Sequence, residues 1–128
     1  MVEKIISATE AKIGSIILID GEPFTIRKMD ISKTGKHGHA KVRAEAVGVL
    51  NDNKKVFVVP GHERFEVPRV NKNKGQVLSI GQNVSIMDLE TFETLEVQCS
   101  EDIKKELEEN SNVEYWEVEG RTIIKRKL

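Results

Sequence analysis

Four basic side chains and two histidines lie in one stretch without an acidic residue, within residues 31–44. Lysine and arginine bind anions such as phosphate, and lysine is also a common target of covalent modification. Lys36 stands between Gly35 and Gly38, and glycine lets a backbone turn sharply and leaves the tip of a loop uncrowded. We therefore expect residues 31–41 to form an exposed loop that presents Lys36.

The positive charge of this stretch is local. The whole chain of 128 residues has a net charge of −1, and without these four side chains its net charge would be −5. Residues 1–70 carry 12 basic and 9 acidic side chains, whereas residues 71–128 carry 8 and 12. A concentrated positive site on an otherwise acidic molecule indicates a polyanionic partner, and the uneven halves indicate two domains.

Other chemistries fit the loop less well. A nucleotide-binding phosphate loop needs a glycine five residues before its Gly-Lys pair and a serine or threonine after it, but Asp30 and His37 occupy those places. His37 and His39 could begin a metal site, although the other soft ligands, His62 and Cys99, lie in distant segments. A solvated basic hairpin without a specific task is the remaining alternative.

Composition places the chain among globular cytoplasmic proteins. It is 38% hydrophobic and 32% charged, and no apolar run reaches the roughly 20 residues of a membrane span. Its N-terminus lacks the apolar core of a signal peptide. Cys99 is the only cysteine, which excludes an internal disulfide and fits a reducing compartment. We expect Cys99 to be a small buried apolar residue.

The first half reads as short strands around turns. Residues 15–19 end at Asp20-Gly21, a strong hairpin signal, and residues 24–27 and 41–46 alternate apolar and polar side chains. Residues 56–59 read as a buried strand, and residues 64–67 alternate again, while residues 3–12 fit either a strand or one turn of helix. Five short strands predict a small barrel over residues 1–69.

The second half follows a polar stretch, Pro68–Gly75, that reads as a linker. Strands are expected over residues 76–80, 83–89 and 94–98, and Ser100 is a good N-cap for a helix at about 101–109, in which Ile103 and Leu107 share a face. A hairpin about Glu119-Gly120 closes the chain. Three strands, a helix and two strands is the order of an OB-fold, which we assign to residues 70–128.

The loop sequence itself, Ser32-Lys33-Thr34-Gly35-Lys36-His37-Gly38-His39-Ala40-Lys41, resembles the modification loop of the hypusine-containing initiation factor 5A family. The likeness continues along the chain. Lys12-Ile13-Gly14 and Asp20-Gly21-Glu22-Pro23 resemble the family's first barrel, and Met87-Asp88-Leu89-Glu90-Thr91 and Val113-Glu114-Tyr115-Trp116 resemble its second. The compact length resembles archaeal members, whereas the distant bacterial relative, elongation factor P, has a third domain.

This resemblance implies a mainly β protein, with an N-terminal SH3-like barrel and a C-terminal OB-fold that carries one short helix. It also implies that Lys36 receives an aminobutyl group from spermidine, giving deoxyhypusine or hypusine, through the NAD-dependent deoxyhypusine synthase. The factor itself would need no cofactor and would not be an enzyme. Its partners would be the synthase, the ribosome and the peptidyl-tRNA. The lengthened Lys36 would approach the acceptor end of the peptidyl-tRNA. There it would promote peptide-bond formation at stalled sequences such as polyproline, and it would also promote termination.

Further expectations are that the protein is a cytoplasmic monomer, with a weak dimer as the alternative, and that the OB half binds RNA poorly because it is acidic. Tyr115 and Trp116 are adjacent and should lie on opposite faces of a strand. The rival functions are a free-standing RNA chaperone that needs no modification of Lys36, and a metal- or lysine-dependent enzyme. The residues expected around Lys36 to shape the loop or contact RNA are Ser32, Lys33, Thr34, Gly35, His37, Gly38, His39, Lys41 and Arg43.

Overall fold

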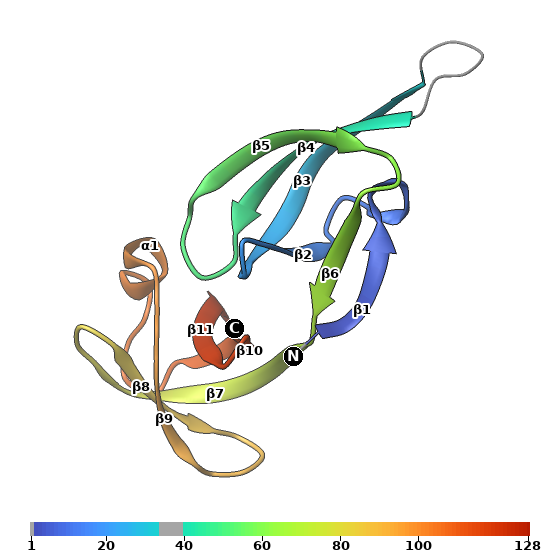
Figure 1. Cartoon of the computed structure of the whole chain (residues 1–128). Helices are drawn as coiled ribbons and strands as arrows, with labels where there is room; N and C mark the ends of the chain where they lie inside the picture. Colours follow the sequence, from blue (N-terminus) through green and yellow to red (C-terminus); the bar gives the residue numbers. More distant parts are fainter. Residues whose placement is uncertain (1, 34–39) are drawn as a thin grey trace. The chain divides into compact units, whose positions relative to one another are not determined.

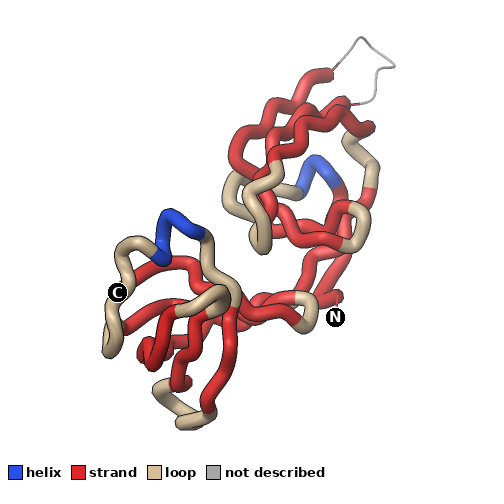
Figure 2. The backbone as a smooth tube through the Cα atoms, turned by 90° about the vertical axis from the view of Figure 1, so that its left-hand side faces the viewer, coloured by secondary structure: helices blue, strands red, loops and turns tan. Residues whose placement is uncertain are grey.

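The computed structural model describes residues 2–33 and 40–128, and the chain divides into two compact units, Met1–Arg69 and Val70–Leu128. Both units consist mainly of strands, and Figure 2 shows only short helical pieces among them. The first unit contains β1 (Val2–Ser7), the 3-10 helix η1 (Ala8–Glu10), β2 (Ile16–Ile19), β3 (Glu22–Lys33), β4 (Ala40–Gly48), β5 (Lys54–Pro60) and β6 (Arg64–Pro68).

Two antiparallel sheets make up the first unit (Figure 1), a four-stranded sheet in the order β2-β3-β4-β5 and the pair β1-β6. The predicted hairpin at Asp20-Gly21 is confirmed, and both residues have positive φ, 52° and 79°. Mirror-image turns of this kind match the twist of the strands that they join. The inward side chains of the sheets form one apolar core, and the SH3-like barrel is confirmed. That core contains Ala8, Ala11, Ile17, Ile26, Val42, Ala44 and Phe65.

Residues 3–12 resolve into both of the alternatives left open, because β1 passes directly into η1. The prediction that residues 56–59 form a fully buried strand is wrong. β5 is half-buried with strict alternation, and Val56 and Val58 are 51% and 61% exposed. Four consecutive apolar residues concealed this alternation, because valine occupies the solvent face as well as the core face of the strand.

The second unit contains β7 (Val70–Ile80), β8 (Val84–Asp88), β9 (Thr94–Val97), α1 (Glu101–Lys104), β10 (Asn112–Val118) and β11 (Arg121–Lys127). Its sheet has the order β11-β10-β7-β8-β9. Gln98 pairs in parallel with Ile123 of β11, through hydrogen bonds from Gln98 N–H to Thr122 O and from Ile124 N–H to Gln98 O, and so closes the sheet. Five strands with a helix before the fourth form the expected OB barrel.

The predicted linker from Pro68 to Gly75 is wrong. β6 runs to Pro68 and β7 begins at Val70, so Arg69 alone separates two strands. The first seven residues of β7 pair continuously with β10. The polar composition of this segment suggested a linker, because exposed lysines alternate there with half-buried asparagines and the usual apolar residues of a strand are absent from residues 71–76.

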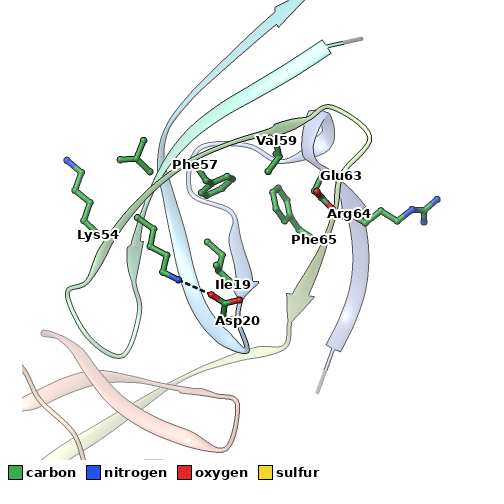
Figure 3. A pocket seen from close by; sticks show the side chains of 10 residues that line it. Ile19, Asp20, Lys54, Phe57, Val59, Glu63, Arg64 and Phe65 are labelled. Carbon is green, nitrogen blue, oxygen red and sulfur yellow. Dashed lines mark hydrogen bonds and ion pairs between the residues drawn. The ribbon is translucent and has the colours of Figure 1, made fainter.

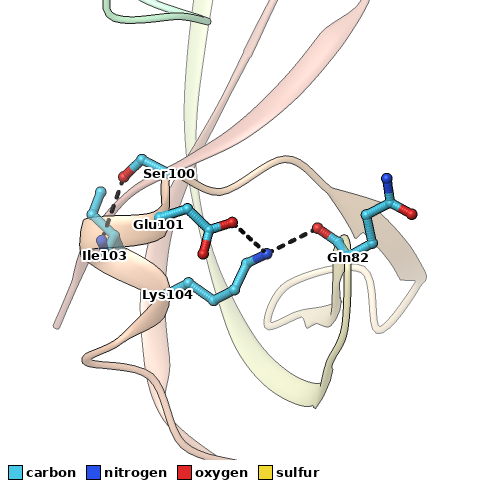
Figure 4. A network of polar contacts seen from close by, with 5 residues as sticks. All are labelled: Gln82, Ser100, Glu101, Ile103 and Lys104. Atoms are coloured by element: carbon cyan, nitrogen blue, oxygen red, sulfur yellow. Dashed lines mark hydrogen bonds and ion pairs between the residues drawn. The ribbon is translucent and has the colours of Figure 1, made fainter.

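The helix is also shorter than expected, since α1 ends at Lys104 instead of about residue 109. Ser100 caps it, and Lys104 Nζ donates to Gln82 O at 3.0 Å and lies 3.4 Å from Glu101 Oε1 (Figure 4). Beyond Lys104 the chain continues through tight turns with i→i−3 hydrogen bonds. Ile103 and Leu107 still pack on the core of the barrel, as their spacing predicts. Among the described residues, no helix has the length and hydropathy of a membrane span.

Candidate functional site

The predicted loop is carried by the longest strand pair of the first unit. β3 and β4 pair from Phe24↔Gly48 to Lys33↔Ala40, and their ends extend past β5 in Figure 1. The expected loop over residues 31–41 is therefore narrower, because residues 31–33 and 40–41 belong to strands. Six expected site residues lie outside the described residues, namely Thr34, Gly35, Lys36, His37, Gly38 and His39.

A β-bulge at Arg27 decides which side chains of β3 face outward. Ile26 lies opposite Ala46 but Lys28 lies opposite Glu45, so Arg27 is the extra residue. Because strand side chains alternate, one extra residue reverses the faces of everything that follows it. Beyond the bulge the two strands stay paired, from Lys28↔Glu45 to Lys33↔Ala40.

The register sorts the expected RNA-contacting residues onto two faces of the hairpin. Ser32 lies opposite Lys41, and Asp30 lies opposite Arg43, all on the outer face of the barrel. Lys33 lies opposite Ala40 on the other face. All three cations are exposed. The hairpin therefore presents positive charge on both of its faces instead of in one row. Lys33 comes just before residues 34–39 in the sequence, and Lys41 and Arg43 come just after them.

Ion pairs with Glu45 partly neutralise the positive charge of the outer face. Arg43 Nη1 lies 3.7 Å from Glu45 Oε2, and Lys54 Nζ lies 3.1 Å from Glu45 Oε1. The hydrogen bond from Lys54 lowers the pKa of the Glu45 carboxyl below its usual value. The Arg43 side chain nevertheless remains 51% exposed. Lys41 and Arg43 are therefore the exposed cations of this face that lie nearest to the loop end of the stem.

The loop end of the β3–β4 stem is held by Gly61, in the turn between β5 and β6. Gly61 N–H donates to Ala40 O at 2.7 Å, and Thr9 N–H donates to Gly61 O at 3.3 Å. A Cβ on Gly61 would lie only 2.8 Å from Thr9 Cγ2 and 3.0 Å from Ala40 Cβ. Gly61 is therefore required because three backbone segments meet there. The sequence indicated only that Gly61 ends a strand. No residue near Gly61 in the sequence indicates its contacts with Thr9 and Ala40.

An open groove of about 780 Å³ lies between β2, β5 and β6 (Figure 3). Phe57 and Phe65 meet in it edge to face, with ring centroids 5.7 Å apart, and Lys55 pairs with Asp20 at its rim at 3.1 Å. Five of its ten lining residues are apolar and five are charged. The lining contains no serine, threonine, cysteine or histidine, the residues that most often form a nucleophile–base pair.

The enzyme and metal alternatives gain nothing from the described residues. Residues 2–33 and 40–128 contain no cluster of three or more histidine, cysteine or acidic side chains that could hold a metal ion. Partial burial raises the pKa of the Cys99 thiol, which makes it a poor nucleophile. Cys99 packs against the core of the second unit, close to the expected role as a small apolar residue, although it is half-buried rather than buried.

Fold and site define a protein with two small β-barrels and a projecting basic hairpin, an arrangement suited to a nucleic-acid partner. Residues 4–62 match the family model described as translation initiation factor 5A-like, N-terminal. The chain is 48% identical over 120 residues to translation initiation factor 5A of Hyperthermus butylicus, covering 91% of this chain and 88% of that one. It is also 48% identical over 118 residues to that of Methanococcus aeolicus, covering 91% and 89%.

Solved structures agree with these relatives. The fold matches eukaryotic translation initiation factor 5A from Methanococcus jannaschii with a TM-score of 0.86 and 43% identity, covering 98% of this chain and 94% of that one. It matches an initiation factor 5A family protein from Naegleria fowleri with a TM-score of 0.80 and 27% identity, covering 99% of both. The chain belongs to the translation initiation factor 5A family. Its role is in translation, and the family implies association with the ribosome.

Proposed function

We propose that this factor promotes peptide-bond formation by extending a spermidine-modified Lys36 towards the acceptor end of the peptidyl-tRNA. The observation that supports the proposal is the β3–β4 hairpin. Its register ends at Lys33↔Ala40, the two described residues between which Lys36 lies in the sequence. The sequence at this place resembles the modification loop of the family.

The physical role of such an arm is positioning. An aminobutyl group would roughly double the reach of a lysine and add a second cationic amine, and ammonium groups donate hydrogen bonds to phosphates, riboses and base edges. Holding a poorly placed peptidyl-tRNA in reactive geometry can lower the activation free energy of peptide-bond formation by several kcal/mol. Ribosomal RNA would remain the catalyst, and stalled sequences such as consecutive prolines, and termination, would benefit most.

The exposed cations of the stem would assist in this position. Lys41 and Arg43 on one face and Lys33 on the other can each meet a phosphate, so the hairpin could enter a cleft with RNA on both sides. The hydrogen bond between Gly61 and Ala40 would keep the direction of the loop end of the stem constant. Deoxyhypusine synthase is the partner proposed for the modification, with spermidine as the donor.

Two measurements test this function. Peptide mass spectrometry of protein from its native host should find one aminobutyl or hydroxylated aminobutyl group on Lys36. In a reconstituted translation assay with a polyproline template, Lys36→Arg should lose the stimulation, whereas Lys41→Arg, which also exchanges lysine for arginine, should retain it. Full stimulation by Lys36→Arg, or by protein that carries an unmodified Lys36, would instead favour an RNA chaperone that needs no modification.

A further inference from the structure

The second unit carries an aromatic and basic surface that the sequence did not lead us to expect. Trp116 of β10 lies directly opposite Lys72 of β7, and Lys72 Nζ lies 4.7 Å from the centre of its ring system. Lys125 Nζ of β11 lies 5.2 Å from the same centre. Trp116 is half-buried and faces away from Tyr115, which is 4% exposed in the core, as the sequence predicted.

A second row of charged side chains lies beside this one. Along the same face, Lys74 of β7 lies opposite Glu114 of β10, and Glu114 lies opposite Arg126 of β11. Glu114 accepts from Trp116 Nε1 at 3.2 Å and from Arg126 Nη2 at 3.2 Å. Glu114 therefore holds the indole and the guanidinium in place. We call this surface the Trp116 face, which consists of Lys72, Lys74, Glu114, Trp116, Lys125 and Arg126.

The rest of the OB barrel has the opposite charge. No lysine or arginine occurs from Gly75 to Ile103, a segment that includes all of β8 and β9 and holds six acidic residues. OB barrels usually bind oligonucleotides over their second and third strands, which are β8 and β9 in this chain. Strands β8 and β9 themselves carry no cation, one exposed carboxylate, Glu96, and the buried Asp88, whereas Lys72, Lys74, Lys125 and Arg126 lie on β7 and β11.

The spacing of the cations suits a chain of phosphates better than a single anion. Lys72 and Lys74 are two residues apart on one face of an extended strand, about 7 Å apart. Arg126, with 65% of its side chain exposed, continues the array across the sheet. A tryptophan among cations is also the combination that holds single-stranded nucleic acids, where bases stack on the ring and ammonium groups contact the backbone.

We propose that the Trp116 face binds the backbone of single-stranded RNA, through Lys72, Lys74 and Arg126 and with Trp116 as the aromatic platform. The site is separate in sequence from the hairpin that carries Lys36, and its binding does not depend on the modification of that lysine. It gives the OB unit a contact with RNA on strands β7, β10 and β11, although the unit as a whole is acidic.

Trp116 is the only tryptophan of the chain, so its intrinsic fluorescence reports on this face alone. Titration of the full, unmodified protein with a short oligouridylate should change that emission, and anisotropy of a fluorescein-labelled oligouridylate should give the affinity. Lys72→Ala/Lys74→Ala should weaken binding about tenfold at low salt. The slope of log K against log salt should fall by about 1.4, because single strands contribute about 0.7 for each lost phosphate contact.

A matched control removes the same charge elsewhere in the unit. Lys105→Ala/Lys127→Ala deletes two exposed lysines, one beyond α1 and one opposite Val113 on the other face of β11, and should bind as the parent does. Equal losses in both double variants would refute a defined site. An unchanged Trp116 emission on RNA binding would also refute it. Equally tight binding of polyglutamate, with the same dependence on Lys72 and Lys74, would assign the face to an acidic protein partner and overturn the RNA proposal.

Discussion

Gly61→Ala should disturb the β3–β4 hairpin from outside it, because Gly61 contacts Ala40 at the loop end of β4. The added Cβ would lie 2.8 Å from Thr9 Cγ2, 3.0 Å from Ala40 Cβ and 3.1 Å from Ala40 O. A real Cβ atom essentially never lies within 3.0 Å of another atom, so Thr9 Cγ2 must move, and the two contacts with Ala40 are tighter than most real ones. The hydrogen bonds that join Gly61 to Ala40 and Thr9 oppose such a movement.

The size of the effect follows from these contacts. Overpacking at a tight site costs about 1–3 kcal/mol, and a weakened hydrogen bond from Gly61 to Ala40 costs about 1 kcal/mol more. The smaller entropy of the unfolded alanine chain returns about 0.4–1 kcal/mol. We expect a net loss of about 2 kcal/mol in the free energy of unfolding, which for a unit of this size lowers Tm by about 10 °C.

Thermal unfolding followed by circular dichroism should measure this loss, and hydrogen exchange should show faster exchange at the amides of Lys41 and Val42. Gly81→Ala is the matched control, because its Cβ would meet nothing closer than Asn83 O at 3.5 Å, and it should change stability by less than about 0.5 kcal/mol. Adding Thr9→Ser to Gly61→Ala removes the nearest methyl group and should recover part of the loss. If Gly61→Ala were as stable as the parent, with unchanged exchange, the close packing at this turn would be refuted.

Two further predictions concern the second unit. The buried Asp88 carboxylate accepts hydrogen bonds from the Tyr115 hydroxyl and from two backbone N–H groups. These bonds lower the pKa of Asp88 below its ordinary value of 3.8 in the folded protein. The stabilisation that they contribute to folding is therefore complete above about pH 4 and is lost as the pH falls through the folded pKa. Tyr115→Phe should cost about 1–3 kcal/mol near neutral pH and should flatten the acid limb of a plot of Tm against pH, whereas an equally steep acid limb would show that the pair contributes little. Ser100→Ala removes the hydroxyl that accepts from Ile103 N–H and should cost about 1 kcal/mol in urea unfolding; Ser100→Asp, which can still cap, should cost less, and equal losses in the two variants would contradict a capping role.

The fold followed from local patterns wherever those patterns were distinct. Alternation along residues 41–46 predicted the buried positions of Val42, Ala44 and Ala46, and the turn residues at 20–21 and 119–120 predicted two hairpins. The shared face of Ile103 and Leu107 was also correct, even though the helix ends early. These features are determined by residues close together in the sequence, which is why sequence reasoning can find them.

The errors arose where partners distant in the sequence decide the structure. The polar residues at the start of β7 form a strand because β10 pairs with them, and nothing within residues 70–75 indicates that partner. The face on which Lys33 lies depends on the register between β3 and β4. The cluster of lysines around Trp116 likewise requires β7 and β11 to lie on either side of β10. Net charge over the whole half concealed that cluster, because a sum over residues ignores where they meet.

The single extra residue at Arg27 has a consequence for anyone who re-engineers this protein. Moving residues 34–39 into another hairpin would transfer the residue to be modified, but not the arrangement of charges below it. Removing Arg27 itself would leave Lys28 opposite Glu45, so the faces beyond it would not change. Removing Met29 while the bulge is kept would instead place Lys33 opposite Lys41, so that Lys33 would join Lys41 while Ser32 and Asp30 turned inward. A successful graft must therefore keep residues 28–33 paired with residues 40–45 in this register, as faithfully as it copies the loop itself.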